Sequence, residues 1–404
     1  MRYLNFALPT IALGLALGVV LSLIPASAAN APLRAAVLDA HPETLLLTAL
    51  DDLQAGRASE AWTILDRLVK RQPNFRLAQL FYGELLAARS GAPARALLVS
   101  SNEPEVKELV EEARLRLRQW RQAPPPGTAP DAILRLSPAQ THAVVVDLTR
   151  ARLYLMENTA NGLRVTKNYY AASGKNGTRK QSAGDNRTPI GVYRVTGALR
   201  DADLPELYGA GAFPVSYPNE WDQRQKKTGN GIWLHGVPRE TYSRAPRSSE
   251  GCVTLANADL MDLKPYLKPG QTPVIFSDSL NWQPRAKLDQ QREEFLKQLE
   301  HWRARWSARD TDAYLAHYAS DFETDGMNKR AFSEYKRRVN ASKSFIEVKL
   351  SDLDVFRYPG DDALMLARFT QNYRSDSFSK SAHKEQFWRR EADGRWRIVK
   401  ESAS

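Results

Sequence analysis

Apolar positions recur at helical spacing from about residue 42 to residue 122, which predicts an α-helical N-terminal region. Gly56 and Pro73 separate two helices of this region. A further helix over 104–121 ends at APPPG (123–127), because proline lacks a backbone donor and cannot continue a helix. The apolar positions are Ala61, Leu65 and Leu68 in one helix, and Leu77, Leu80 or Phe81, and Leu85 in the next.

The period changes to that of β-strands after residue 137. A β-branched run over 143–148 and an apolar segment over 152–156 flank a short turn, which predicts a hairpin. Loops rich in Gly, Asn and Pro separate the later segments. The strands predicted for this mainly-β region are 143–148, 152–156, 165–172, 191–196, 231–234 and 273–276.

The C-terminal region begins with helices and continues with strands. A long, charged amphipathic helix is predicted over 285–309 and a short one over 311–318. Turn residues such as PGD (359–361) and DG (393–394) bound the strands, so this region is predicted to be α+β. Its predicted strands are 345–350, 353–358, 363–373, 383–390 and 396–399.

The first 28 residues have the pattern of a secretory signal peptide. Met1 and Arg2 give a positive start, residues 6–23 are almost wholly apolar, and ASA (26–28) is a small-residue cleavage site. An uncleaved membrane anchor is the alternative, because the apolar run approaches the roughly 20 residues that span a bilayer. Both interpretations predict that the rest of the chain is exported and contains no further membrane span.

The composition indicates an ordinary folded protein of two or three domains. Its 404 residues are 43% hydrophobic and 25% charged, which argues against a disordered, collagen-like or multi-span membrane protein. The formal charge of +11 favours an anionic partner such as nucleic acid, anionic lipid or an acidic wall polymer. Export and the lack of a nucleic-acid-binding motif argue against nucleic acid.

Neither a metal nor another cofactor is expected. The histidines are dispersed, and the single cysteine has no partner at zinc-binding spacing. The loop GKNG (174–177) lacks the spacing of a phosphate-binding loop, and no helix is predicted after it. The histidines are His41, His142, His235, His301, His317 and His383.

The only cysteine, Cys252, lies in the segment WLHGVPRETYSRAPRSSEGCVTL (233–255), seventeen positions after His235. A lone cysteine cannot form an internal disulfide, and a small buried apolar residue is its simplest interpretation. The segment favours a nucleophile instead, because acyl transfer needs a thiolate, an imidazole and amide donors for the oxyanion. His235 would then exchange protons with Cys252. Gly251 would let its own amide and that of the cysteine approach the substrate, while Ser249 would orient the loop or the imidazole.

Residues 141–277 resemble the YkuD-type L,D-transpeptidase catalytic domain. Four segments carry the resemblance, namely VVVDLTRARLYLME (144–157), TPIGVY (188–193), His235-Gly236 and SxGCV (249–253). The resemblance implies a β-rich sandwich whose cysteine attacks a tetrapeptide stem of peptidoglycan, releases the terminal D-amino acid and passes the acyl group to an amine. It implies Cys252 as nucleophile, His235 as proton acceptor and donor, and a role for Gly236 in loop geometry.

Two positions depart from the commonest form of that motif. Glu250 stands where a histidine is frequent, and Thr254 stands where Arg or Asn is usual. Both positions are candidates to line the acceptor or leaving-group side, so the second substrate stays open. Water as acceptor would make an L,D-carboxypeptidase that trims tetrapeptides to tripeptides, whereas a diaminopimelate amine or a lipoprotein lysine would make a transpeptidase. Cleavage of such links and a catalytically inactive, wall-binding scaffold are further alternatives.

The C-terminal region resembles the NTF2-like (SnoaL-like) cone in HYASDF (317–322) and FWRREADGRWRIVKE (387–401). That fold hosts enzymes and binding modules, so we expect an accessory domain that docks glycan, peptide or another protein. We expect Trp388 and Trp396 to pack or to bind ligand rather than to catalyse. A second active site is the less favoured alternative, and its candidate residues are His317, Asp321, Asp325 and His383.

The predicted fold class is therefore multidomain, with helical, mainly-β and α+β parts. The run 45–91 resembles one tetratricopeptide-type hairpin, and an ordinary helical bundle is the alternative. Peptidoglycan stem peptides are the expected partner, and other cell-wall proteins are candidates to bind the helical and NTF2-like parts. The predicted division is signal peptide 1–28, helical region 29–122, Pro-rich linker 123–139, catalytic domain 140–278 and NTF2-like domain 279–404.

Overall fold

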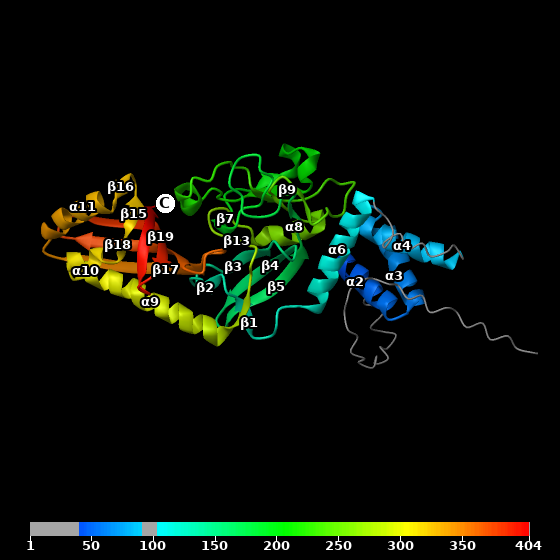
Figure 1. The fold of residues 1–404 in the computed structure, drawn as a ribbon, viewed down its shortest axis with the longest axis horizontal. Helices are drawn as coiled ribbons and strands as arrows, with labels where there is room; N and C mark the ends of the chain where they lie inside the picture. Colours follow the sequence, from blue (N-terminus) through cyan, green and yellow to red (C-terminus); the bar gives the residue numbers. More distant parts are fainter. Residues whose placement is uncertain (1–39, 91–102, 404) are drawn as a thin grey trace, which may run out of the picture. The chain divides into compact units, whose positions relative to one another are not determined.

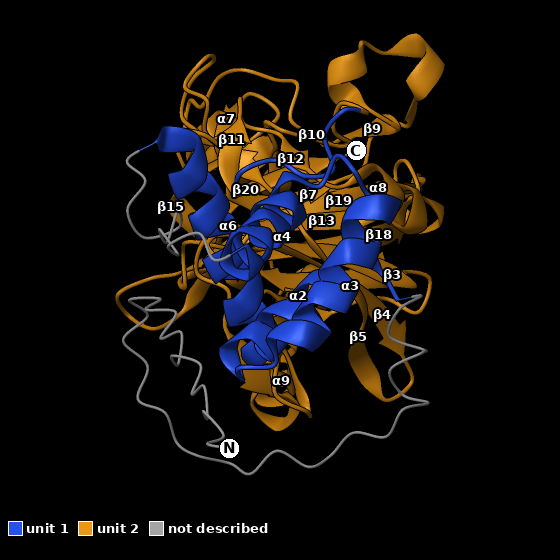
Figure 2. Ribbon diagram, turned by 90° about the vertical axis from the view of Figure 1, so that its right-hand side faces the viewer, with its two compact units in different colours: residues 1–121, 240–245 blue, residues 122–239, 246–404 orange. Residues whose placement is uncertain are grey.

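The computed structural model describes residues 40–90 and 103–403 (Figure 1). The chain divides into two compact units (Figure 2). Unit 1 comprises Met1–Arg121 with Glu240–Ala245, and unit 2 comprises Gln122–Arg239 with Pro246–Ser404. The predicted signal peptide lies outside the described residues. Within the described ranges, no helix has the length and apolar character needed to cross a membrane.

Unit 1 is built from helices at the predicted places. Leu65 and Leu68 are fully buried and Phe81 is nearly so, as the apolar spacing predicts. Gly56 turns the chain between the first two helices with a φ of +75°, a conformation that favours glycine. The resemblance to a tetratricopeptide hairpin stays a prediction. The helices are α2 (Pro42–Gln54), α3 (Ala58–Arg71), α4 (Arg76–Arg89) and α6 (Pro104–Arg121).

A five-stranded sheet in the order β5-β4-β3-β13-β7 forms the centre of the catalytic half of unit 2. The first two predicted strands form the predicted antiparallel hairpin, with Val144 opposite Leu155. The last strand of the domain runs parallel to the first, with Ile275 opposite Val145. The strands are β3 (His142–Asp147), β4 (Arg152–Thr159), β5 (Gly162–Tyr170), β7 (Gly191–Arg194) and β13 (Pro273–Ser277).

A second sheet, in the order β12-β10-β9-β8, packs against one face of the first. Val144 and Leu155 share a buried cluster with Phe213, Leu234 and Val253 of this second sheet. The mainly-β fold predicted for the catalytic region is confirmed. The additional elements are β6 (Ser173–Gly174), β8 (Leu199–Arg200), β9 (Gly211–Pro214), α7 (Glu220–Arg224), β10 (Trp233–His235), β11 (Arg247–Ser249), β12 (Val253–Thr254) and α8 (Asn257–Leu263).

The C-terminal half of unit 2 is the predicted α+β fold, with a seven-stranded sheet in the order β16-β15-β20-β19-β18-β17-β2. Helices pack on one face of this sheet, where Trp302 and Phe332 join Trp388 in a buried cluster (Figure 1). The elements are β2 (Ile133–Arg135), α9 (Arg285–Ser307), α10 (Thr311–Leu315), β15 (Tyr318–Thr324), β16 (Met327–Asn328), α11 (Lys329–Ala341), β17 (Ile346–Arg357), β18 (Leu364–Ser375), β19 (Ser379–Arg390) and β20 (Trp396–Ala403).

Three features of this half differ from the predicted elements, and one of them is that strands β15 and β16 were not predicted. The strands predicted over 345–350 and 353–358 are a single strand, β17, which is interrupted by a register shift between Ser351 and Asp354. Asp352 in this bulge has a φ of +52°. Helix α11 was not predicted at all.

The two halves of unit 2 share a hydrophobic core. On β18, Leu366 faces the catalytic half, whereas its neighbour Ala367 faces the helices, since alternate residues of a strand point to opposite faces. The cluster on the catalytic side includes Phe387 of β19, and its ring stacks on Trp221 of α7 with centroids 5.6 Å apart. The five-stranded sheet is therefore covered on both faces.

The segment expected to be a linker has regular structure. β1 (Thr128–Pro130) pairs with β14 (Trp282–Pro284), and β2 pairs with β17 of the NTF2-like sheet. The domain boundaries themselves stay predictions. Because the two halves share one core, deleting everything after Asn281 would expose apolar surface of the catalytic sheet. Such a deletion therefore tests folding as much as it tests wall binding.

We predict that Phe387→Ala lowers the free energy of unfolding of unit 2 by about 3–5 kcal/mol, because it leaves a cavity in the shared core. Thermal unfolding followed by near-UV circular dichroism should show one transition that moves as a whole. Phe378→Ala is the matched control, since that side chain is 54% exposed. Two separate transitions, only one of which moves, would contradict a shared core.

Candidate active site

The candidate nucleophile and base lie on neighbouring strands of the four-stranded sheet. β10 ends at His235, and Cys252 directly precedes β12. The two strands run parallel, with Leu234 opposite Val253. Continuing this register by one residue places Cys252 beside Trp233. The pairing therefore brings the chain segments that carry the two candidate residues side by side.

His235 is held in one orientation and one tautomer. Its side chain is buried, and its Nδ1 lies 2.7 Å from the carbonyl oxygen of Gly236. A carbonyl oxygen only accepts, so Nδ1 carries the hydrogen and Nε2 is the nitrogen that can take up a proton. The Tyr208 ring meets the imidazole edge-on, with centroids 5.0 Å apart. This is the tautomer that a general base acting through Nε2 requires.

Cys252 is presented by a tight turn. The residue is partly exposed, and its thiol donates to the carbonyl oxygen of Gly231 at 3.4 Å. The Ser249 hydroxyl donates to the carbonyl oxygen of Cys252 at 2.6 Å and accepts from the Gly251 amide at 3.1 Å. These bonds close the turn, which is the first of the two roles expected for Ser249.

Gly251 is needed for both the backbone conformation and the packing of this turn. Its φ is +122°, which L side chains rarely adopt. A Cβ at this position would lie 2.7 Å from the carbonyl oxygen of Arg187. The turn therefore packs closely against the loop 174–188.

The loop 174–188 braces the turn rather than holding a phosphate. The backbone amides of GKNG all donate within the protein. The bond from Lys175 goes to the carbonyl oxygen of Ser249, so this loop is attached directly to the turn. The donor–acceptor pairs are Gly174 to Thr188 Oγ1 at 2.9 Å, Lys175 to Ser249 O at 2.8 Å, Asn176 to Asn186 O at 3.2 Å and Gly177 to Gly174 O at 2.9 Å.

Asp185 fixes the far end of the same loop. It accepts from Lys180 Nζ at 2.7 Å, and also from the amides of Gln181, Ser182 and Arg187. Burial alone would raise the pKa of Asp185, but the ammonium and the three amides hold that pKa well below its usual range. The carboxylate therefore stays charged, and the loop stays closed, at neutral pH.

Asn257 is a site residue that the sequence reasoning missed. Its Oδ1 accepts from the amides of Ala210 and Val237 at 2.9 and 3.1 Å, and its Nδ2 donates to the Val237 carbonyl at 2.8 Å. A Cβ at Gly236 would lie 2.1 Å from this Oδ1. Gly236 therefore lets Asn257 approach the backbone directly after His235.

The two departures from the common motif have different surroundings. The Glu250 side chain is 84% exposed and lies 3.9 Å from Lys175 Nζ. Thr254 is buried opposite His235, and its hydroxyl has no hydrogen-bond partner among the described residues. Glu250 alone of the two is therefore open to a second substrate.

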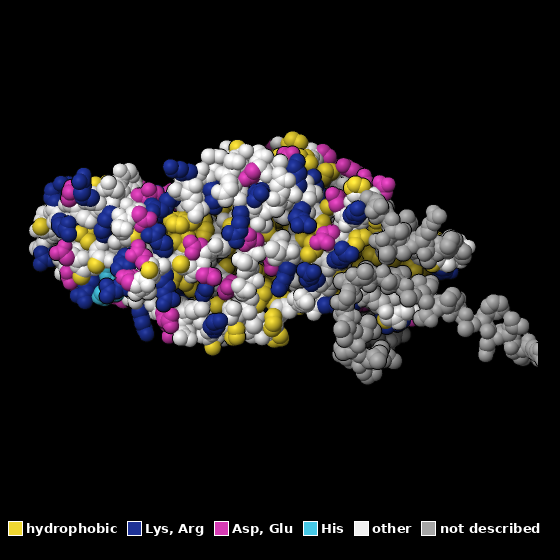
Figure 3. Space-filling view, in the orientation of Figure 1, with side chains coloured by type: hydrophobic (Ala, Val, Ile, Leu, Met, Phe, Trp, Pro, Cys, Tyr) yellow, Lys and Arg dark blue, Asp and Glu magenta, His cyan; other side chains and the backbone are white. Residues whose placement is uncertain are grey.

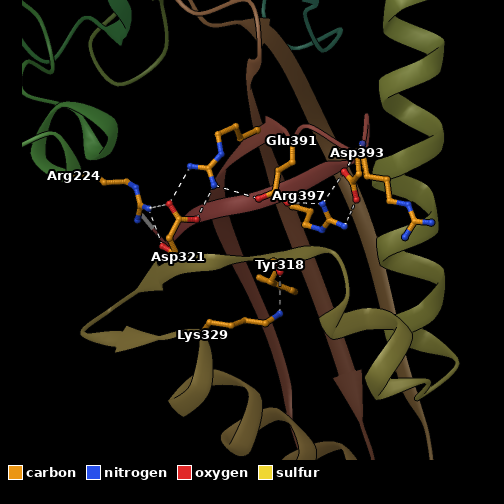
Figure 4. A network of polar contacts seen from close by, with 9 residues as sticks. Arg224, Tyr318, Asp321, Lys329, Glu391, Asp393 and Arg397 are labelled. Atoms are coloured by element: carbon orange, nitrogen blue, oxygen red, sulfur yellow. Dashed lines mark hydrogen bonds and ion pairs between the residues drawn. The ribbon is translucent and has the colours of Figure 1, made fainter.

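Three residues of the alternative second site, His317, Asp321 and His383, have other partners. The His317 ring lies 3.0 Å from His301, and burial lowers the pKa of His317. Asp321 binds Arg224 of α7 and Arg389 of β19, each at 2.8 Å (Figure 4). His383 lies beside Thr370 on the neighbouring strand. In the described part of the chain, no group of three His, Cys, Asp or Glu side chains is placed to hold a metal ion.

Charged pairs are widespread on unit 2. Figure 3 shows acidic side chains interspersed with lysines and arginines on the face in view, rather than one basic patch. Beneath the network of Figure 4, Lys329 Nζ donates to the carbonyl oxygens of Leu315 and Tyr318. Burial of this ammonium lowers the pKa of Lys329 to about 8.

Two family models match the two halves of unit 2. Residues 141–276 match the family model of the L,D-transpeptidase catalytic domain. Residues 294–402 match the model of the Cds6 C-terminal NTF2-like domain. The chain thus has a YkuD-type catalytic domain and a C-terminal NTF2-like domain, and both predicted resemblances are confirmed.

Solved structures of similar fold come from two bacteria. Bd1075 of Bdellovibrio bacteriovorus is 28% identical, with a TM-score of 0.61, and the match covers 69% of this chain and 98% of that chain. Pgp2 of Campylobacter jejuni, described as a helical cell shape determining protein, is 23% identical with a TM-score of 0.56. That match covers 68% of this chain and 93% of that chain. A comparison with curated proteins gave no match.

We predict that Gly251→Ala lowers the rate of Cys252 alkylation by iodoacetamide about 100-fold, because the new Cβ would collide with Arg187 and displace the turn. Gly177→Ala is the matched control. Its φ is +87°, but its Cβ would meet no heavy atom within 4 Å. Mass spectrometry follows the reaction cleanly because the chain has one cysteine. Equal rates in both variants would show that the close approach is unimportant.

A pH dependence follows from the lowered pKa of Lys329. Below about pH 8, Lys329 is charged in both the folded and the unfolded protein, and folding half-buries the charge. Between about pH 8 and 10.5, Lys329 is neutral in the folded protein but still charged in the unfolded one. Stability relative to Lys329→Met should therefore rise between pH 8 and 10.5. Urea unfolding at pH 7 and 10 measures this difference. Lys349→Met, at a 72% exposed side chain, is the control, and a pH-independent difference would refute the assignment.

Proposed function

We propose that this protein is an exported, cysteine-dependent L,D-transpeptidase that acts on tetrapeptide stems of peptidoglycan. The observation that carries the proposal is the parallel pairing of β10, which ends at a histidine with a fixed Nδ1 hydrogen, with β12, which directly follows a partly exposed cysteine. Members of the matched domain family act on peptidoglycan peptides and are generally cell-envelope enzymes. The N-terminal pattern supports export.

The first half-reaction forms a thioester. His235 Nε2 takes the proton of the Cys252 thiol, and Sγ attacks the carbonyl carbon that joins the third residue of the stem to its terminal D-amino acid. The Cys252 amide is a donor for the resulting oxyanion. The Gly251 amide becomes a second donor when it exchanges its bond to Ser249 for one to the substrate. The C–N bond then breaks, and His235 returns its proton to the leaving amine.

The second half-reaction transfers the acyl group. An acceptor amine attacks the thioester, passes a proton to His235 and forms a new amide bond, and the Cys252 sulfur leaves and regains its proton. Water in place of the amine would give a tripeptide and an L,D-carboxypeptidase. The exposed Glu250 carboxylate favours the amine, because it attracts an ammonium group to the rim of the site before the amine loses its proton.

The likeness to Pgp2 supports a role in wall remodelling that affects cell shape. The likeness itself shows only a similar fold. The proposed acyl transfer by Cys252 would be the activity that remodels the wall. The NTF2-like half and the helical unit are proposed to bring the active site to the wall or to other wall proteins. Trp388 is fully buried, which supports packing rather than catalysis for that residue.

The test incubates purified protein with disaccharide-tetrapeptide muropeptides and separates the products by mass spectrometry. We expect cross-linked dimers and free D-amino acid from the wild type. Cys252→Ala should lower product formation more than about 1,000-fold, since it removes the nucleophile that carries the acyl group. His235→Gln should lower it about 100-fold or more, since it removes the group that transfers the proton. His383→Gln, at an exposed histidine outside the site, is the control for the second variant.

The products separate the alternatives. Cysteine-dependent tripeptides without dimers would make the protein an L,D-carboxypeptidase. Unchanged tetrapeptide, together with a thiol that reacts with neither iodoacetamide nor a carbapenem, would make the domain an inactive scaffold. Product formation that survives Cys252→Ala would refute the mechanism.

A further inference from the structure

The helical unit contains a short piece of the chain that lies between the base and the nucleophile. Residues Glu240–Ala245 belong to unit 1, although His235 precedes them and Cys252 follows them in sequence (Figure 2). The helices and the candidate active site are therefore connected twice, once through residue 122 and once through this segment.

Tyr242 is the anchor of the segment in the helical unit. It is buried, and its ring packs on Phe75, just before α4, with centroids 4.2 Å apart. Its amide donates to the carbonyl oxygen of Asn74 at 3.1 Å. The Arg116 guanidinium covers the Phe75 ring at 5.4 Å. Tyr242 is thus held by both its ring and its backbone.

Ser243 is held by a buried ionic cluster. Its hydroxyl donates to Glu112 Oε1 at 2.8 Å, and the same oxygen accepts from Arg116 at 2.9 and 2.8 Å. Arg116 also binds Glu43 of α2 at 2.9 Å, and all three charged side chains are nearly inaccessible. Burial raises the pKa of Glu112, an effect that Arg116 and Ser243 oppose. Removing one partner of a buried ion pair is strongly destabilising, because the other charge is left uncompensated.

The two ends of the same loop are attached to unit 2. On the side of His235, the Arg239 amide donates to Glu206 at 2.8 Å. On the side of Cys252, the carbonyl oxygen of Pro246 accepts from the Ser173 amide at 2.8 Å, directly before β11. The middle of the loop therefore has its contacts within the helical unit, and the residues on either side of it have theirs within the catalytic domain.

We propose that the helical unit controls the active site through this loop, with Tyr242 and Ser243 as positioning residues that set the placement of Cys252 relative to His235. The inference rests on the proposed cysteine chemistry but uses contacts that lie outside the site. Releasing the middle of the loop removes the restraint on the residues that lead into β11, which ends at Ser249, the residue whose hydroxyl closes the turn 249–252. The effect on the thiol then needs no change in Cys252 or His235.

The test measures Cys252 in the full-length protein in two ways. The first readout is the rate of alkylation by iodoacetamide as a function of pH, which reports the apparent pKa of the thiol. The second readout is kcat and KM on the tetrapeptide substrate. Tyr242→Ala should slow alkylation about tenfold, shift its pH profile upward and lower kcat about tenfold with little change in KM, since misalignment affects the reacting groups more than binding. Ser243→Ala should lower both rates about threefold.

Two controls separate positioning from general stability. Tyr242→Phe keeps the ring on Phe75 and should behave as the wild type. Tyr82→Ala removes a comparable ring contact within unit 1, where Tyr82 packs on Trp62 with centroids 4.8 Å apart, and it should leave both readouts unchanged. Far-UV circular dichroism shows whether each variant is folded. If Tyr242→Ala does not fold, the alkylation and kinetic results for Ser243→Ala test the positioning role instead.

The outcomes distinguish this inference from the proposed function. Folded Tyr242→Ala and Ser243→Ala proteins with wild-type alkylation profiles would overturn the inference, whatever the substrate proves to be. An equal loss in Tyr82→Ala would also overturn it, because the effect would then be one of overall stability. A wild type that is alkylated readily but yields no product from tetrapeptides would refute the proposed substrate, and the alkylation comparison would still decide the role of Tyr242.

Discussion

Burial of the five-stranded sheet on both faces is the constraint on which the rest of unit 2 depends. Val144 and Val146 of β3 point into the cluster shared with the second sheet, whereas Ala143 and Val145 point into the cluster shared with the NTF2-like half. A strand covered on both sides needs apolar residues at consecutive positions, which explains the unbroken run in β3. The NTF2-like half is therefore part of the structure that supports the catalytic domain, as well as a candidate binding module.

The candidate active site gains its precision from this support. His235 and Cys252 lie at the ends of strands in the sandwich, so their backbone positions are set by sheet pairing rather than by a free loop. Two glycines allow the close approaches that complete the arrangement, Gly251 against Arg187 and Gly236 against Asn257. The candidate residues thus lie on or directly beside paired strands, while Tyr242, in the segment between them, packs on Phe75.

The sequence pattern predicted the parts whose signals are local. The β-branched run of β3 and the spacing of His235 and Cys252 are visible in single segments. The role of Asn257 is not, because its partners are 20 and 47 positions away. Helix α11 was missed because its buried side is narrow, with Phe332 as its one fully apolar buried residue. β2 is too short to stand out from a proline-rich segment, and only its pairing with β17 identifies it as a strand.

The pairing of β2 with β17 also has a kinetic meaning. Ile133 lies opposite Phe356, so the edge of the seven-stranded sheet joins residues more than two hundred positions apart. Between them the chain must form the whole catalytic sandwich and α9. Contacts of such sequence separation are slow to form, since the chain loses much entropy before they stabilise it. A nascent chain that emerges from its N-terminus would hold β2 without a partner until almost the last strands arrive, and the thiol would reach its working geometry only after that closure.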